Sequence, residues 1–292
     1  MTVAPLRYES IPLHERIGPF AYAIPADFNQ QRLPSLGIDS PGYLADHDGR
    51  PCAEPSILCG QHTWVARQRY SWGGSVHAKC DVHLLKPVYP GTTIHVTAQI
   101  AGKYERRGGR YVVFELETMD DQGDVVCRVQ NTMLLNLREL LAYRDRTTEP
   151  REAERRVERT SSGPRLELSF GPKTLTRDDL LRFFRAEEQV YGPHPSIHND
   201  DAIARQAGLA DIVAPGRYLI ALTTCMFAKV YGPAWFHSAR YSVSFLNNLL
   251  PGVVAEVRAG VPGVAGAFSV SCRDAASGKA LLAGTVAREE GK

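Results

Sequence analysis

Two histidines stand four residues apart in the stretch YGPHPSIHNDDAIARQAGL, residues 191–209. The pKa of a free imidazole lies near neutral pH, so His194 and His198 could each transfer a proton. Tyr191 and Glu188 precede them and could supply an acidic proton or a carboxylate. These residue types therefore indicate acid–base chemistry at this loop.

The same stretch contains acceptable metal ligands, but its sequence argues against a metal site. Pro195 stands between the two histidines, and a proline interrupts helical geometry. The two imidazoles would therefore not share one helix face, as they do in an HExxH zinc motif. Asp200 precedes the helical run DAIARQAG, where an aspartate accepts backbone N–H groups as a helix cap. We expect neither a metal nor a cofactor here.

A second source of chemistry follows the loop. The segment VAPGRYLIALTTC, residues 213–225, is typical of an apolar helix that begins at Pro215. The N–H groups of Gly216 and Arg217 would then lie unpaired at the positive end of the helix dipole. Such donors can stabilise an oxyanion. On the other side of the loop, LTRDDLLRFFRAEE predicts a helix with Thr176 as its N-cap, so helices hold the loop at both ends.

The composition excludes several classes of protein. The chain has 292 residues, 43% apolar and 23% charged, which is ordinary for a globular protein with a sizeable core. A net charge of +2 gives no basic stripe for nucleic acid. No apolar run is long enough for a membrane span, and the N-terminus lacks a signal-peptide core. The six cysteines form no CxxC pair and read as reduced core thiols, which favours a cytoplasmic protein.

The two halves of the chain repeat one order of signals. Pro55 and Pro215 each precede an apolar helical run, and Pro-Gly turns follow at residues 90 and 251. Turn glycines then stand at residues 123 and 278. Repetition at this period indicates a duplicated domain. A helix followed by several antiparallel strands in each copy predicts an α+β fold, with each sheet wrapped round a central helix. We expect domains at 1–140 and 166–292, joined by a charged linker at 141–165 whose residues 144–163 make no core contacts.

The segments SWGGSVHAKCDVHLLKPVYPGTTIHV and PSIHNDDAIARQAGLADIVAPGRYLIAL carry a resemblance to a known family. The chain resembles the MaoC-like hydratases and dehydratases, and among them the two-hotdog members such as type 2 3-hydroxyacyl-thioester dehydratases and mesaconyl-CoA hydratases. The resemblance implies a tandem (double) hotdog fold. It also implies reversible hydration and dehydration of an enoyl or 3-hydroxyacyl thioester, carried on coenzyme A or acyl-carrier protein.

By position, the resemblance makes His198 the family histidine and Gly216 the glycine that opens the buried helix. Pro193 stands where the family has its catalytic aspartate, and Pro215 replaces a family histidine. We therefore expect His198 to be the principal proton-transfer residue, with His194 and then Tyr191 as substitutes for the aspartate. The first half has no matching histidine, which predicts one active site per chain and a first half that shapes the acyl pocket.

The missing aspartate leaves alternatives open. They are cyclisation by addition of an internal hydroxyl (oxa-Michael), movement of a double bond, and acyl-thioester binding without catalysis. The hairpin GKYERRGGR carries Arg106, Arg107 and Arg110, which could bind the phosphates of coenzyme A or of a carrier-protein arm, or could form a solvated tip. His77 and His83 are expected on one face of a strand. Assembly into a homodimer is left open.

Overall fold

The computed structural model describes residues 4–38, 42, 44–71, 75–136, 166–260 and 266–289. The expected linker at 141–165, including the segment 144–163, lies outside the described residues. The elements of the first half are β1 (Ala4–Pro5), η1 (Tyr8–Ser10), β2 (Arg16–Ala23), α1 (Phe28–Arg32), η2 (Leu33–Leu36), η3 (Pro55–Gly60), α2 (Gln61–Ala66), β3 (Tyr70–Ser71), β4 (Val76–Leu84), β5 (Thr93–Arg106), β6 (Gly109–Asp120) and β7 (Val125–Leu134). Those of the second half are β8 (Leu166–Thr174), α5 (Arg177–Tyr191), α6 (Asp201–Gln206), α7 (Gly216–Tyr231), η4 (Gly232–Ala234), α8 (Trp235–Ser238), β9 (Ala239–Phe245), β10 (Val254–Gly260), β11 (Phe268–Asp274) and β12 (Ala280–Arg288).

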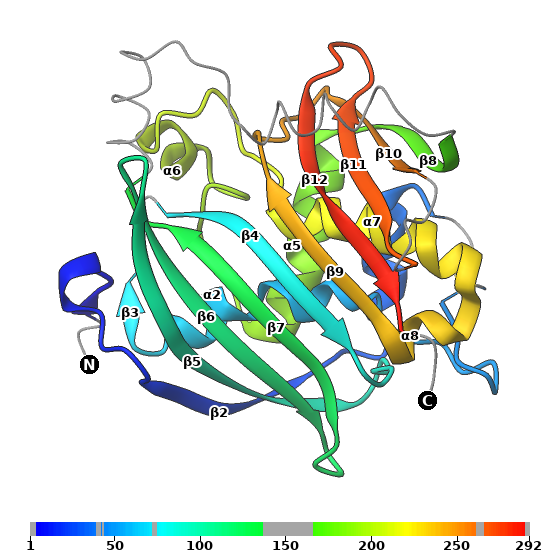
Figure 1. Cartoon of the computed structure of the whole chain (residues 1–292), viewed down its shortest axis with the longest axis horizontal. Coiled ribbons are helices and arrows are strands. Elements are labelled where there is room, and N and C mark those ends of the chain that lie inside the picture. The colour runs from blue at the N-terminus through cyan, green and yellow to red at the C-terminus, as the bar shows by residue number, and fades with distance from the viewer. Residues whose placement is uncertain are drawn as a thin grey trace.

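One ten-stranded sheet runs through both halves in the order β2-β5-β6-β7-β4-β9-β12-β11-β10-β8 (Figure 1). The order read outward from β4 in the first half is matched by the order read outward from β9 in the second. The two central strands pair antiparallel, from Lys79 with Ser244 to His83 with Arg240. Each half therefore closes the sheet edge of the other, so that the two copies share one continuous sheet, and the predicted duplication is confirmed.

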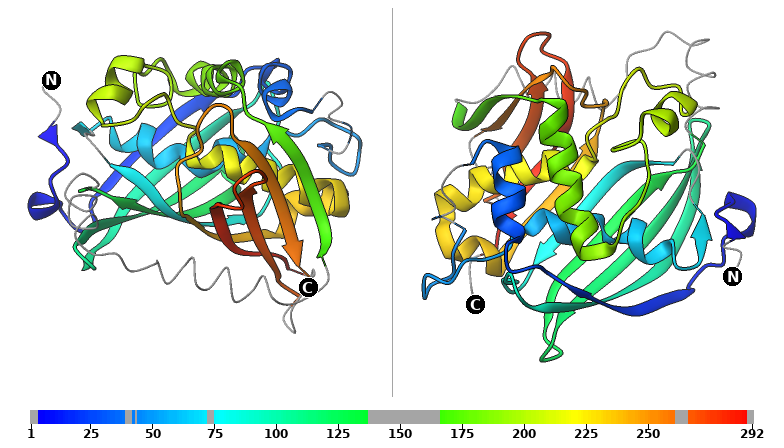
Figure 2. Two further views of the ribbon diagram at one scale, coloured as in Figure 1. Left: turned by 90° about the horizontal axis from the view of Figure 1, so that it is seen from above. Right: turned by 180° about the vertical axis from the view of Figure 1, so that it is seen from behind.

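The helices gather on one side of the curved sheet (Figure 2). Residues 217–228 of α7 are all buried, and η3 and α2 supply the corresponding helical segment of the first half. The stretch Gly216–Ser238 is long and apolar enough to cross a membrane by composition, but 67% of its most apolar window is buried inside the protein. The apolar run is therefore explained as the core helix of the second half, which confirms the predicted α+β architecture.

The turn glycines occupy equivalent places in the two halves. Gly91 and Gly252 have φ of 84° and 87°, and Gly123 and Gly278 have φ of 83° and 71°. Glycine adopts this left-handed conformation without a steric cost, which explains its presence at these turns.

Helix α7 begins one residue later than predicted. Pro215 has an extended backbone (φ −63°, ψ 144°), so it is the N-cap and Gly216 is the first helical residue.

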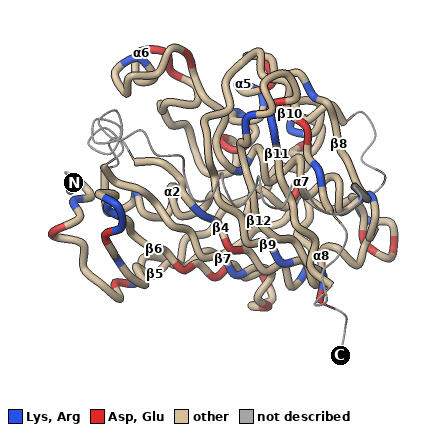
Figure 3. Tube along the Cα trace, turned by 45° about the horizontal axis from the view of Figure 1, so that its top comes forward, with Lys and Arg blue, Asp and Glu red and all other residues tan. Residues whose placement is uncertain are grey.

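The cysteines and the surface charges fit the composition. All six cysteines are buried and free of disulfide bonds, as predicted for reduced core thiols. Figure 3 shows Lys and Arg interspersed with Asp and Glu, as a net charge near zero leads one to expect.

Candidate active site at the start of α7

The loop with the two histidines is held by a capped helix at each end. Thr176 and Asp179 form a reciprocal capping box at the start of α5, which confirms the predicted helix start. Asp200 caps α6 by accepting hydrogen bonds from the backbone N–H groups of Ala202 and Ile203 at 2.8 and 3.0 Å. The prediction that Asp200 is a helix cap is therefore confirmed.

Within the loop, one carboxylate holds the backbone in place. Oε1 of Glu188 accepts from the backbone N–H of His194 at 2.8 Å and from Nδ2 of Asn199 at 3.0 Å. Asn199 Oδ1 in turn accepts from the backbone N–H of Ser196 at 2.8 Å. Burial raises the pKa of the Glu188 carboxyl. Glu188, which sequence reasoning considered as a proton-transfer partner, therefore acts in the structure to hold the loop.

His198 is oriented by the segment that leads into α7. Its Nδ1 lies 2.8 Å from the carbonyl oxygen of Val213, and a carbonyl can accept but not donate. Nδ1 therefore carries the proton, and Nε2 keeps its lone pair. Burial, together with the positive charges of Arg217 and Arg67, lowers the pKa of His198 to about 3. The imidazole is thus neutral and able to accept a proton at Nε2.

The same contact places the histidine close to the start of α7. The backbone N–H of Val213 donates to the carbonyl of Ile197 at 3.1 Å, so the loop and this segment run side by side. Val213 is three residues before Gly216. Pro215 offers no side-chain cap, and within the described residues the N–H groups of Gly216 and Arg217 have no hydrogen-bond partner. Two backbone donors are therefore open beside His198.

In the first half, the start of η3 corresponds to the start of α7, and there the carboxylate of Glu54 accepts from the backbone. Glu54 accepts from the backbone N–H of Ser56 at 2.9 Å and from its hydroxyl at 2.6 Å, at the start of η3. The donors that are open at α7 are thus satisfied at η3. This difference gives a physical basis for expecting one active site per chain.

Two glycines permit close packing around Arg217. A Cβ at Gly216 would lie 2.9 Å from the Phe245 ring, and a Cβ at Gly60 would lie 2.5 Å from Cδ of Arg217. Both contacts are shorter than real Cβ atoms tolerate. Gly216 thus makes room for the aromatic ring of Phe245, and Gly60 lets the Arg217 side chain cross the first-half helix.

A buried ion-pair network joins the two halves at this point. Arg217 pairs with both carboxylate oxygens of Glu187, with Nε 2.5 Å from Oε1. Glu187 also pairs with Arg32 at 3.1 Å, and Arg32 pairs with Glu54 at 2.7 Å. All four side chains are buried. Arg217 therefore has an unpaired backbone N–H, while its guanidinium is held by Glu187.

The first half contributes two further histidines that sequence reasoning did not assign to the site. Asn131 Oδ1 accepts from Nε2 of His77, and Asn131 Nδ2 donates to Nδ1 of His62, both at 2.7 Å. The His77 ring lies 4.6 Å from the Phe245 ring. Burial lowers the pKa of His77 to about 4 and that of His62 well below its usual value, and Arg217 adds to both shifts. Both imidazoles are neutral members of a hydrogen-bonded chain.

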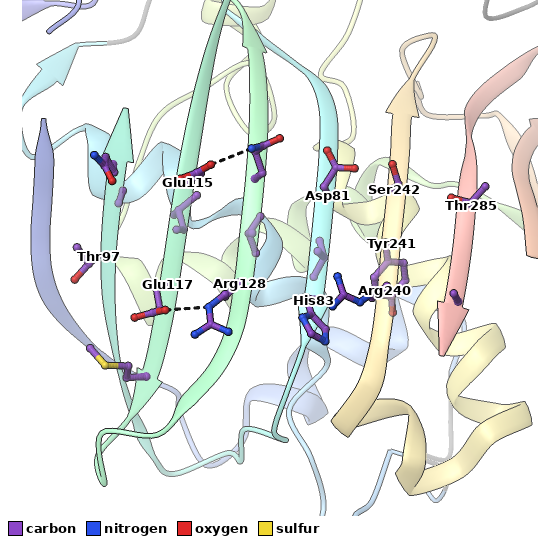
Figure 4. A pocket seen from close by; sticks show the side chains of 18 of the residues that line it. Asp81, His83, Thr97, Glu115, Glu117, Arg128, Arg240, Tyr241, Ser242 and Thr285 are labelled. Atoms are coloured by element: carbon purple, nitrogen blue, oxygen red, sulfur yellow. Dashed lines mark hydrogen bonds and ion pairs between the residues drawn. The ribbon is translucent and has the colours of Figure 1, made fainter. Parts of the chain in front are cut away.

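The expectation that His77 and His83 share one strand face is wrong. The register of β4 against β7 shifts between His77 and Lys79, and such a bulge reverses the alternation of side chains. His77 consequently points inward, whereas His83 faces the outer groove beside Arg240 (Figure 4).

The other two sequence-predicted residues make no direct contact with His198 among the described residues. Tyr191 and His194 pack on Trp64, with ring centroids 5.4 and 5.7 Å away. His198 packs on Phe184 at 5.6 Å. In the part of the chain that is described, no hydrogen bond or ring contact joins His198 to His194 or Tyr191. The Tyr191 hydroxyl donates to the carbonyl of Ile57 at 3.0 Å, which ties α5 to η3.

The arginines of the β5–β6 hairpin lie at its tip. Arg110 pairs with Glu9 at 3.0 Å and with Glu105 at 3.5 Å. Arg106 ends β5, and Arg107 occupies the turn with φ of 50°. These contacts give Arg110 a structural role, and phosphate binding by the three arginines stays a prediction.

A groove on the outer face of the sheet is a second candidate site (Figure 4). Two of its arginines are paired: Arg128 with Glu117 at 3.0 Å, and Arg240 with Glu289 at 2.6 Å. In the described strands, the backbone N–H groups bond to neighbouring strands and do not point into the groove. The groove therefore lacks the two unpaired backbone N–H groups that the described residues present at the start of α7.

Comparison with known proteins supports the same fold. No family model matches the chain, and no curated protein matches it in sequence.

A MaoC-like dehydratase is similar in structure, with 14% identity, a TM-score of 0.69, and coverage of 97% of this chain and 100% of that one. The full-length peroxisomal multifunctional enzyme type 2 from Drosophila melanogaster matches at 14% identity and a TM-score of 0.69, over 94% of this chain and 48% of that one. A conserved hypothetical protein from Mycobacterium tuberculosis with a double hotdog fold matches at 10% identity and a TM-score of 0.61, over 97% of each chain. The chain thus has the double hotdog fold that the sequence predicts.

Proposed function

We propose that this double hotdog protein catalyses the reversible hydration of an enoyl thioester to a 3-hydroxyacyl thioester, carried on coenzyme A or acyl-carrier protein. The observation that supports this most is the position of neutral His198, fixed by Val213, beside the open N-terminus of α7. The structural likeness to MaoC-like dehydratases favours the same class of reaction.

The chemistry of hydration needs one base and one oxyanion site. Nε2 of His198 takes a proton from water as the water oxygen bonds to C3 of the enoyl group. The electrons of the C2–C3 double bond move toward the thioester oxygen, which accepts hydrogen bonds from the N–H groups of Gly216 and Arg217. The imidazolium then gives its proton to C2 and the thioester carbonyl forms again. One water is added, His198 returns to its neutral form, and dehydration is the reverse.

Beside the base, a second group is expected at the place of the missing aspartate, where it would hold the attacking water. His194 Nε2 is buried and has no hydrogen-bond partner within the described residues, whereas the Tyr191 hydroxyl is bound to Ile57. These contacts favour His194 over Tyr191 as the group that holds the attacking water. Tyr191 is then the residue that positions the end of α5.

The proposal is tested by adding the purified protein to enoyl-CoA thioesters of increasing chain length and following the loss of the enoyl-thioester absorbance. The expected product is the 3-hydroxyacyl-CoA, identified by mass spectrometry as substrate plus one water. Conversion to an isomer of equal mass would replace the proposal with double-bond isomerisation. Binding of saturated acyl-CoA without turnover of any enoyl or hydroxyacyl thioester would replace it with a binding function.

A further inference from the structure

The side chains of the first turn of α7 reach into the first half of the protein. The Tyr218 hydroxyl donates to the carbonyl oxygen of Ser35 at 2.7 Å, and both residues are buried. The Arg217 guanidinium is held by both carboxylate oxygens of Glu187, which also pairs with Arg32 of the first half. The backbone that carries the two unpaired N–H groups is therefore anchored to the other half through its own side chains.

Arg217 is packed closely along its whole length. It crosses the first-half helical segment at Gly60, where a Cβ would lie 2.5 Å from its Cδ and 3.0 Å from its Nε. Its guanidinium carbon lies 5.6 Å from the centre of the Phe184 ring, and that ring lies 5.6 Å from the His198 ring. A shift of the Arg217 side chain would therefore be transmitted to both parts of the candidate site.

Two adjacent carboxylates of α5 hold the two sides of the site. Glu187 binds the Arg217 guanidinium, and the next residue, Glu188, accepts from the backbone N–H of His194 in the loop. Apolar side chains of similar size often stabilise a core as well as a buried ion pair does. A bidentate pair between arginine and a carboxylate adds a defined geometry, which is the property that an oxyanion site needs.

We infer that Glu187 and Gly60 are positioning residues for the oxyanion site, because they fix the side chain of Arg217. The backbone N–H groups of Gly216 and Arg217 are thereby held where the thioester oxygen binds. The inference rests on the proposed function for the role of these two N–H groups. The first half, whose own helix start is closed by Glu54, determines in this way how well the site in the second half works.

The expected signature is a fall in kcat with little change in binding. Removal of one oxyanion donor typically slows a reaction about 10²–10³-fold, and a displacement of about 1 Å can slow it about 100-fold. The thioester oxygen carries more negative charge in the transition state than in the bound substrate. A misplaced donor therefore lowers kcat more than it lowers affinity.

The first test is Gly60→Ala, which leaves every charge of the network in place. The backbone of Gly60 (φ −105°, ψ 3°) is open to alanine, but the new methyl group must displace Arg217, whose far end is fixed by Glu187. We expect kcat to fall about tenfold to a hundredfold, with affinity for the saturated thioester near the wild-type value. Gly102→Ala in β5 is the matched control, because its Cβ would meet no atom within 4 Å; its kcat should be unchanged.

The second test separates position from charge and stability. Glu187→Gln/Arg217→Met removes one charge of each sign and leaves Arg32 balanced by Glu54, so it should recover most of the stability that Glu187→Gln loses. The charge of Arg217 lowers the pKa of His198, so its removal should favour the base. Despite both effects, kcat should stay about tenfold or more below the wild type. A folded double variant with wild-type kcat would overturn the inference.

A third measurement does not depend on turnover. Butyryl-CoA and octanoyl-CoA labelled with carbon-13 at the thioester carbonyl are bound to each protein, and the carbonyl stretch is followed by isotope-edited infrared spectroscopy. Hydrogen bonds from the two N–H groups polarise the carbonyl and lower its stretching frequency. The wild type and Gly102→Ala should show this shift, and Gly60→Ala and the double variant should lose most of it. No shift in the wild type, or an equal shift in all four proteins, would count against the positioning role; if one variant does not fold, the other decides.

The outcomes distinguish this inference from the proposed function. A carbonyl shift that depends on Gly60 and Glu187, in a protein that hydrates no thioester, would contradict the proposed function alone. Hydration by the wild type, with kcat and carbonyl shift unchanged in Gly60→Ala and in the double variant, would contradict the positioning role alone.

Discussion

His198 donates from Nδ1 to the carbonyl oxygen of Val213 at 2.8 Å, and this contact connects the loop between α5 and α6 to the segment that leads into α7. A histidine fixed in this way presents the unprotonated Nε2, and the helix that follows presents two open N–H groups. The contact therefore sets both the tautomer of His198 and its position relative to the two unpaired N–H groups.

From the two half-buried neutral histidines, His198 and His77, we predict a loss of stability in acid. The pKa values of His198 and His77 in the folded protein are about 3 and about 4, below the usual value for an unfolded chain. Their stabilisation is therefore complete above a pH of about 6.5 and is lost as the pH falls toward 3 to 4. Between pH 6.5 and 5 the loss should be about 2 kcal/mol for each histidine, measured by urea unfolding across this range.

His77→Gln should remove one histidine's share of this pH dependence. Glutamine still donates to Asn131 Oδ1, as His77 does, but it does not titrate. The matched control is His95→Gln on the exposed sheet face, where the imidazole contacts Asp121; it should leave the acid sensitivity near that of the wild type. An unchanged slope in His77→Gln would show that burial of His77 does not contribute.

Glu187→Gln should be strongly destabilising. Glu187 is the carboxylate shared by Arg32 and Arg217, and its neutralisation leaves a buried positive charge without a partner. We expect the free energy of unfolding to fall by about 3–5 kcal/mol. Glu117→Gln on the outer face, where Glu117 pairs with exposed Arg128, should cost less than about 1 kcal/mol. Equal effects of the two substitutions would contradict the role assigned to the network.

The duplication could be predicted from sequence because it depends on local signals. The left-handed turns at residues 91 and 252 require glycine. The spacing of these glycines from Pro55 and Pro215, which precede the helical segments, repeats along the chain. The loop helices were likewise predictable, since the Thr176 and Asp200 caps bind N–H groups within three residues. Both are short-range effects that a sequence pattern preserves.

The rest of the site depends on contacts between distant residues. Tyr191 is bound to Ile57, which is 134 residues away in sequence, and Arg67 meets its environment only when the halves pack. The inward position of His77 follows from a register shift that leaves no mark in the alternation of residue types. Such features require the three-dimensional arrangement.

Asp200→Ala should affect stability and leave the chemistry intact. Asp200 caps α6 through two backbone N–H groups, and loss of such a cap costs about 1 kcal/mol. Asp200→Asn should restore most of this stability, because asparagine also caps helices. Thermal unfolding and hydration rates measured on both variants check the assignment. A large fall in turnover for Asp200→Asn, with normal stability, would instead make the carboxylate part of the reaction.

The role of His198 as the base is tested most directly by the turnover of His198→Ala on the enoyl thioester that the wild type hydrates best. We predict that kcat falls about 10²–10⁴-fold in His198→Ala. The control is His83→Ala on the outer face of β4, in which kcat should stay near the wild-type value. Binding of the corresponding saturated thioester should be unchanged in both. A His198→Ala variant that is folded and keeps near-wild-type turnover would contradict the assignment of His198 as the base.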